Sequence, residues 1–117
     1  MNNNFIRELE YYEDHFWNFY QTLRPEVQKK VDWTLELVAT LEKVPIKYFK
    51  YMEDSSGIFE VRVEYGSDIY RIFSFFDKGN LVVLVNGFHK KTQKTPKKEI
   101  KLAEKLKQKY LNEKYGK

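Results

Sequence analysis

The chain has 117 residues, of which 42% are apolar and 17% aromatic, and this length predicts one domain spanning residues 1–117. It contains no cysteine, which excludes disulfides, thiolate zinc sites and a cysteine nucleophile. The net charge of +4 is uneven, because residues 86–117 hold eleven lysines against three glutamates while the remainder is mildly acidic. This pattern predicts either a localised phosphate-binding patch or a solvated basic helix face with a basic tail.

The sequence carries no membrane or export signal that we recognise. No apolar run approaches the roughly 20 residues of a membrane span. The start, Met1-Asn2-Asn3-Asn4, lacks the charged beginning and apolar run of a signal peptide. We therefore expect a cytoplasmic protein.

Two helices are predicted after residues 5–12, which form either a short edge strand or the lead-in to a helix. Residues 13–23 carry apolar side chains at helical spacing, namely Phe16, Phe19, Tyr20 and Leu23. Pro25 suits the first turn of a second helix that continues to about Lys43. Its apolar face is formed by Val27, Val31, Leu35 and Val38 and widened by Trp33 and Leu37. The short separation predicts an antiparallel helical hairpin.

Residues 46–57 are predicted to be a connector. Its first part alternates lysines with rings, namely Lys47, Tyr48, Phe49, Lys50 and Tyr51. Interleaved cations and rings can hold a single-stranded nucleic acid by charge and stacking. The same rings could equally pin a loop to the core.

A period of two begins at Ile58 and predicts strands. Residues 58–65 place Phe59, Val61, Val63 and Tyr65 on one face and Glu60, Arg62 and Glu64 on a solvent-exposed face. Residues 69–76 form a second strand, and the turn around Gly79 leads into a buried third strand, residues 81–85. These three strands form an antiparallel meander.

A lysine-rich helix closes the chain, with Thr95 as its cap and Pro96 as its first residue. Its buried stripe consists of Ile100, Ala103, Leu106 and Tyr110. The order of helical hairpin, meander and final helix predicts an α+β fold.

The chemistry of the chain is cationic. It has no phosphate-binding glycine loop, and its two histidines, His15 and His89, lack metal-ligand spacing, so no metal or cofactor is expected. Arg71 interrupts an apolar strand and needs a partner, which is either a glutamate of the preceding strand or a bound phosphate. Residues 86–98 follow a buried strand and bring one ring, one histidine and a row of lysines to a sheet end, an arrangement that suits a polyanion.

Three segments resemble the RelE/ParE superfamily of bacterial toxins: residues 58–62 (Ile-Phe-Glu-Val-Arg), residues 70–72 (Tyr-Arg-Ile), and residues 82–96, which contain Asn-Gly-Phe-His-Lys-Lys-Thr-Gln-Lys-Thr-Pro. The third resembles the signature of the HigB-like, phage-derived branch. The resemblance implies a RelE-like microbial RNase fold, in which an N-terminal helical hairpin packs on a twisted, mainly antiparallel sheet with a C-terminal helix.

The resemblance also implies a function and its partners. The protein would be the toxin of a type II toxin–antitoxin system, an endoribonuclease that cleaves mRNA in the ribosomal A site by metal-free attack of the 2′-hydroxyl. A small helix-turn-helix antitoxin would neutralise it. Other superfamily members act on gyrase, and a gyrase-directed or non-catalytic binding protein is the alternative.

The resemblance assigns roles to residues of this chain. Arg62 and Arg71 match phosphate-stabilising cations, Lys90 and Lys91 match the basic end of the last central strand, and His89 is the candidate for proton transfer. The expected RNA-binding residues are Phe88, which would stack on a base, with Lys94, Lys97, Lys98, Lys47 and Lys50. Glu60 stands where some members carry a lysine, and the general acid and base stay open.

Overall fold

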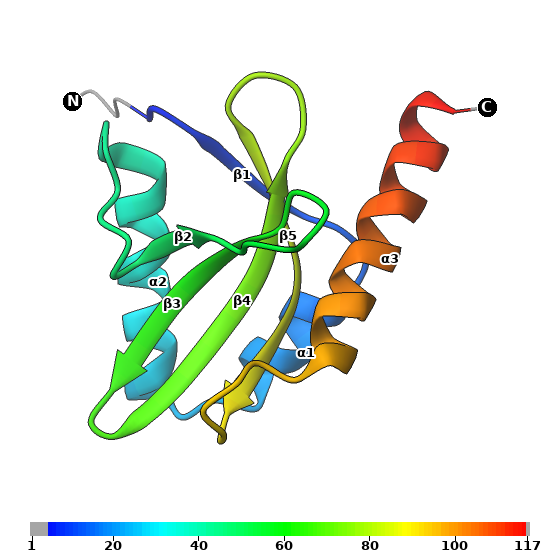
Figure 1. Ribbon diagram of the computed structural model, residues 1–117. Coiled ribbons are helices and arrows are strands. Elements are labelled where there is room, and N and C mark those ends of the chain that lie inside the picture. Colours follow the sequence, from blue (N-terminus) through cyan, green and yellow to red (C-terminus); the bar gives the residue numbers. More distant parts are fainter. Residues whose placement is uncertain (1–4, 117) are drawn as a thin grey trace.

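The computed structural model describes residues 5–116, which form three helices and a five-stranded sheet (Figure 1). In chain order the elements are β1 (Glu8–Tyr11), α1 (His15–Gln21), α2 (Pro25–Thr40), β2 (Phe49–Tyr51), β3 (Phe59–Tyr65), β4 (Asp68–Phe76), β5 (Leu81–Lys90) and α3 (Lys97–Tyr115). The predicted α+β fold is confirmed. The polar start at residues 1–4 lies outside the described residues, and no helix within 5–116 has the length and apolarity to cross a bilayer.

The strand order is β1-β5-β4-β3-β2. The predicted meander of β3, β4 and β5 is confirmed, and β2 joins it antiparallel to β3. Residues 5–12, for which a strand and a helix lead-in were both open, contain the edge strand β1, which pairs in parallel with β5. The parallel pairing is possible because α1, α2 and three strands separate the two partners in the sequence.

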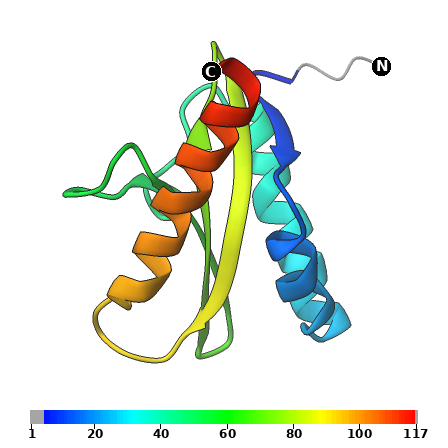
Figure 2. The same ribbon diagram turned by 90° about the vertical axis from the view of Figure 1, so that its right-hand side faces the viewer.

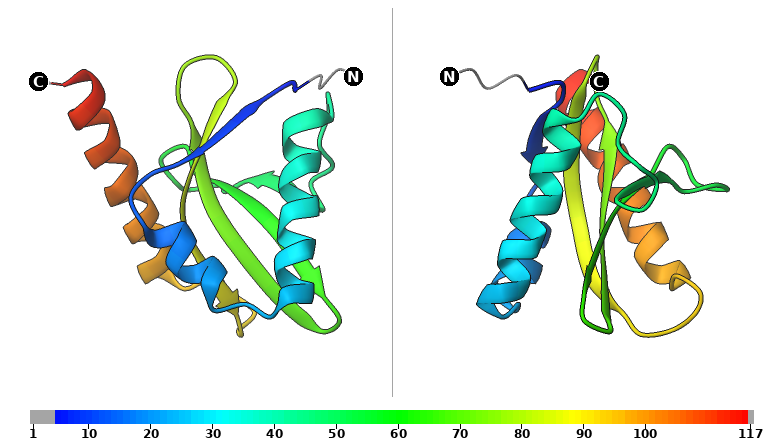
Figure 3. Two further views of the ribbon diagram at one scale, coloured as in Figure 1. Left: turned by 180° about the vertical axis from the view of Figure 1, so that it is seen from behind. Right: turned by 90° about the vertical axis from the view of Figure 1, so that its left-hand side faces the viewer.

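Helices cover both faces of the sheet (Figure 2 and Figure 3). The helical hairpin of α1 and α2 packs on one face, here called the hairpin face, where Val31 of α2 meets Val61 and Ile72. α3 packs on the opposite face, here called the α3 face, where Leu106 meets Phe73 and Phe75. Two apolar layers therefore share one sheet, and the side-chain period of two decides which layer each strand residue enters.

Several boundaries differ from the sequence-based prediction, including that of β5, which continues to Lys90 rather than ending at Val85. The connector contains β2, whose Phe49 stacks on Phe59 at a centroid distance of 5.1 Å; three residues are too few for a visible period. α2 ends at Thr40 rather than near Lys43. α3 begins at Lys97 with Pro96 at the cap position and no side-chain capping bond, so the assignment of Thr95 as its cap is wrong.

A bulge in β5 changes which face its last residues occupy. Ile72 pairs with Gly87 and Ser74 with Leu84, so two residues of β5 lie opposite Phe73 alone. Before the bulge Val83 and Val85 point to the α3 face, and after it Phe88 does. The extra residue therefore reverses the alternation along the strand.

The C-terminal half of α3 is anchored through Asp77, in the turn between β4 and β5. Its buried carboxylate accepts hydrogen bonds from the Tyr110 hydroxyl at 2.6 Å, the Tyr115 hydroxyl at 2.7 Å and the Lys114 ammonium at 3.0 Å. Burial opposes ionisation, but these donors outweigh it and hold the pKa of Asp77 well below its usual range.

We predict that Asp77→Asn lowers the free energy of unfolding by about 2 kcal/mol at pH 7, because it removes a charged acceptor shared by several donors. A carboxylate whose pKa is lower in the folded state stabilises the fold at pH values above its unfolded pKa of about 4. This stabilisation is lost as the pH falls from there toward the folded-state pKa. The difference in unfolding free energy between wild type and Asp77→Asn, measured by urea unfolding, should therefore narrow below pH 4. Asp14→Asn, at an exposed aspartate without a side-chain cap bond, is the control and should change little.

Candidate active site on the α3 face

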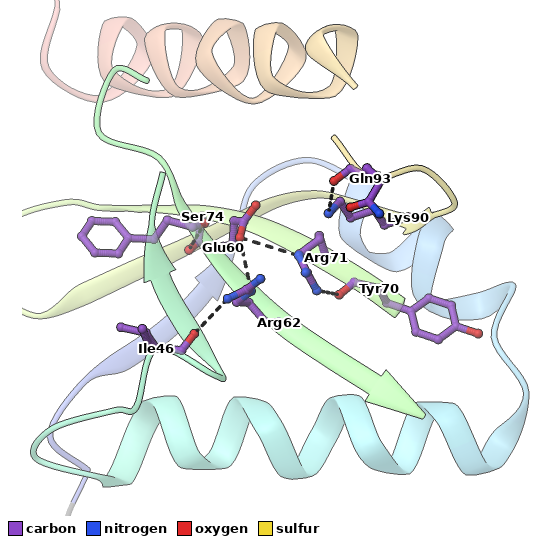
Figure 4. Close-up of polar contacts among 9 residues, drawn as sticks. Ile46, Glu60, Arg62, Tyr70, Arg71, Ser74, Lys90 and Gln93 are labelled. Atoms are coloured by element: carbon purple, nitrogen blue, oxygen red, sulfur yellow. Dashed lines mark hydrogen bonds and ion pairs between the residues drawn. The ribbon is translucent and has the colours of Figure 1, made fainter. Parts of the chain in front are cut away.

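Two arginines and one glutamate lie together on the α3 face (Figure 4). Arg62 of β3 is directly opposite Arg71 of β4, and Glu60 precedes Arg62 by two residues. The period of two therefore puts all three side chains on one face. Because Arg71 is only 3% exposed, its charge needs a partner inside the protein.

Glu60 is that partner, and it serves both arginines. Its Oε1 lies 3.4 Å from Nε of Arg62 and 3.6 Å from Nε of Arg71. The side chain was predicted to face solvent, but it is 7% exposed, because burying the Arg71 guanidinium requires a buried carboxylate beside it. One carboxylate thus compensates two guanidinium groups, which leaves a local excess of positive charge.

Each guanidinium group donates a hydrogen bond to a main-chain carbonyl. Arg71 donates from Nη1 to the Tyr70 carbonyl at 3.1 Å, and Arg62 donates from Nη1 to the Ile46 carbonyl at 3.3 Å. Within the described residues the Nε of each arginine is buried without a hydrogen-bond acceptor. Both Nε atoms are directed at Oε1 of Glu60, at 3.4 and 3.6 Å, so this carboxylate compensates their charge without forming a close hydrogen bond.

Lys90, at the end of β5, adds a third cation to this face. It is half-buried, and its Nζ donates to the Gln93 carbonyl at 2.9 Å. Burial and the charge of Arg71 lower the pKa of Lys90, while Glu60 offsets part of this effect. Burial and the neighbouring Arg62 likewise lower the pKa of Arg71, which as a guanidinium stays charged. A lysine shifted in this direction is better suited to exchanging a proton near neutral pH.

A family model for phage-derived Gp49-like proteins (DUF891) matches residues 18–108, a span that contains the whole cluster. The chain belongs to this family. Gp49-like proteins are related to the RelE/ParE toxins and resemble the toxins of toxin–antitoxin systems. No curated protein matches the chain.

His89 does not join the cluster of this Gp49-like protein. Its ring stacks on Tyr70 at 4.7 Å, on the hairpin face. Its Nε2 lies 3.4 Å from Oδ1 of Asp68. His89 was expected beside Arg62 and Arg71, but the bulge places it on the other face: without the bulge His89 would share their face, and the extra residue turns Lys90 toward it instead.

Phe88 is also placed differently from the prediction. It is 9% exposed and packs edge-on against Phe73 at 5.3 Å, within the core under α3. The ring is therefore part of the core and has no open face for a nucleobase.

The remaining predicted lysines are exposed around the cluster. Lys91 and Lys94 lie in the loop after β5, and Lys97 and Lys98 open α3. On the other side, Lys50 pairs in register with Glu60, so it occupies the same face, and Lys47 lines a hollow that also includes Arg62. These lysines surround the cluster but make no contact that would define a role in bond cleavage.

Glu60 was one of the two glutamates of the preceding strand expected to pair with Arg71, and the ion pair bears this out. One further residue of the site was not anticipated. Asn86, at the bulge, is buried and donates from Nδ2 to both the carbonyl and the carboxylate of Glu99 at 3.1 Å. It ties the start of α3 to the sheet and so fixes the loop that carries Lys91 and Lys94. No three His, Cys, Asp or Glu side chains within 5–116 converge as a metal site would require.

We predict that Glu60→Gln lowers the free energy of unfolding by about 2–3 kcal/mol, because it leaves two guanidinium groups without their shared counter-ion. Inorganic phosphate should restore much of this loss, since an anion binding only the folded state stabilises it. Urea unfolding in phosphate and in chloride of equal ionic strength measures both effects. Glu64→Gln, an exposed position on the same strand, should change stability by less than about 0.5 kcal/mol. Equal recovery in the two salts would show that the cluster does not bind the anion.

Proposed function

We propose that this protein is a HigB-like toxin of a type II toxin–antitoxin system and inhibits translation as a ribosome-dependent mRNA endonuclease. The observation that carries the proposal is the cluster of Arg62, Arg71 and Lys90 on the α3 face, with Glu60 as its counter-ion. Such fixed, partly desolvated charge matches the needs of a phosphate whose negative charge increases in the transition state.

In the proposed reaction the 2′-hydroxyl attacks the adjacent phosphorus, and the bond from phosphorus to the 5′-oxygen breaks. The products are a 2′,3′-cyclic phosphate and a 5′-hydroxyl. Arg71 and Arg62 would hold the non-bridging oxygens through guanidinium N–H groups. Their charge favours the pentavalent transition state over the ground state, and this difference accelerates the reaction.

Two proton transfers accompany this reaction. The 2′-hydroxyl loses a proton as it attacks, and the 5′-oxygen gains one as it leaves. We propose Lys90 as the donor to the 5′-oxygen, because it lies on the reacting face and its pKa is lowered. Glu60 is the carboxylate in the cluster that could accept the proton from the 2′-hydroxyl.

The surrounding lysines would position the RNA rather than react with it. Lys91, Lys94, Lys97 and Lys98 on one side and Lys47 and Lys50 on the other would contact mRNA and ribosomal RNA backbones. Binding through such contacts weakens steeply with salt. The same basic surface suits neutralisation by an acidic segment of a cognate antitoxin, which we propose to be a small helix-turn-helix protein.

We predict that induced Arg71→Gln and Lys90→Gln variants no longer arrest growth, because each loses a transition-state interaction that contributes about 10²–10³-fold to the rate. His89→Gln, on the opposite face, should remain toxic and is the matched control. Primer extension on cellular mRNA should show new 5′ ends within codons for wild type and His89→Gln only. Intact mRNA together with DNA damage would instead identify a gyrase-directed toxin, and intact mRNA with normal growth would contradict any toxic activity.

A further inference from the structure

A second feature lies at the outer edge of β3, beyond the end of β2. β2 pairs with residues 59–61, and Tyr48 just before it accepts a hydrogen bond from the Arg62 N–H, so β3 lacks a strand partner on that side beyond Arg62. A hollow occupies this place and is lined by Lys30, Lys47, Tyr48, Arg62, Glu64 and Gly66. It therefore combines side chains from α2, from the segment before β2, and from β3.

One aromatic ring, Tyr48, lines this hollow, and a second ring, Trp33, packs against it. Trp33 of α2 and Tyr48 lie 5.5 Å apart with their planes at 84°. Trp33 was predicted to widen the apolar face of its helix, but it is 45% exposed. Lys30 Nζ lies 5.3 Å from the Trp33 ring, and Lys47 Nζ lies 5.6 Å from the Tyr48 ring. Exposed rings with adjacent cations are the means by which proteins hold unpaired bases and the backbone beside them.

Arg62 connects the hollow to the candidate active site. Its Nε faces Glu60, and its Nη1 donates to the Ile46 carbonyl in the segment leading to Tyr48. A phosphate held by Arg62 and Arg71 would therefore have the hollow beside it. The next nucleotide along the strand would reach the hollow with its base.

The chemistry of the hollow favours a base over a second phosphate. The Glu64 carboxylate lines it and would repel a phosphate. The main-chain N–H of Arg62 donates toward β2, to the Tyr48 carbonyl, so the period of two directs the N–H and C=O of Glu64 to the same edge. Since β2 has no residue opposite Glu64, this edge offers a donor and an acceptor to a planar, hydrogen-bonding group.

We propose that Trp33, Tyr48, Lys30 and Lys47 form a subsite for an unpaired nucleobase of the RNA, next to the phosphate held by Arg62 and Arg71. The subsite deepens the proposed function, from which it takes RNA as the substrate. It supplies the stacking contact that the buried Phe88 does not provide.

Binding of a fully 2′-O-methylated single-stranded RNA oligonucleotide, which cannot be cleaved, tests the subsite by fluorescence anisotropy. Trp33→Ala and Tyr48→Ala should each weaken binding about tenfold, the loss expected when a base loses its stacking partner. Tyr48→Phe keeps the ring and should bind as wild type. Inorganic polyphosphate, which has no bases, should bind all these variants equally well.

The chain contains a matched control pair at its opposite edge. Tyr11 of β1 and Trp17 of α1 lie 5.3 Å apart at 87° and are 53% and 38% exposed. Tyr11→Ala and Trp17→Ala remove similar rings in a similar arrangement. Both variants should leave the affinity for the oligonucleotide unchanged.

The outcomes separate the subsite from the proposed function. Wild-type affinity of Trp33→Ala and Tyr48→Ala for the oligonucleotide would overturn the subsite, and so would an equal loss of RNA and polyphosphate binding. If Tyr48→Ala selectively loses RNA while Arg71→Gln still arrests growth, the subsite stands and the proposed reaction fails.

Discussion

The burial of the Arg71 guanidinium within an apolar strand is the constraint on which the α3 face depends. In a medium of low dielectric constant this charge requires a carboxylate on the same face, and Glu60 on the neighbouring strand provides it. The carboxylate also holds Arg62, directly opposite Arg71. The α3 face is therefore divided into an apolar part under α3 and a charged part beside it. Moving α3 over the charged part would bury further unpaired polar groups.

Features of the α3 face that depend on a pattern within one segment could be predicted from the sequence, whereas features that depend on pairing between strands could not. Alternation over residues 58–65 and 69–76 is local, and it correctly brings Arg62 and Arg71 together. The alternation of apolar and polar residues does not reveal the bulge in β5. This bulge determines which face of the sheet His89 and Lys90 occupy. Gly87 was the available hint, since an isolated glycine within a strand often marks a bulge or a close approach. A Cβ there would lie 2.5 Å from the Phe19 ring, which couples the bulge to the packing of α1.

Other features depend on contacts between distant segments and have no local signature. β2 forms because Phe49 packs against Phe59 and Phe76, which lie in two later strands. The links that hold α3 include one from Asn86 near its start and one from Asp77 near its end. Each link joins a polar side chain to a partner that composition and spacing do not identify. The consequence is functional, because the first link fixes the lysine-bearing loop beside the cluster.

Arg62 belongs both to the arginine cluster and to the hollow, so a substitution there cannot test the two sites separately. Its guanidinium contacts Glu60 of the cluster and also lines the hollow beside Tyr48. A substitution at Arg62 would thus disturb phosphate binding and base binding together, and their effects would not be additive. Arg71 contacts Glu60 of the cluster and does not line the hollow, whereas Trp33 packs against Tyr48 beside the hollow. These two positions, rather than the arginine between them, can report on each site independently, because neither shares a contact with the other.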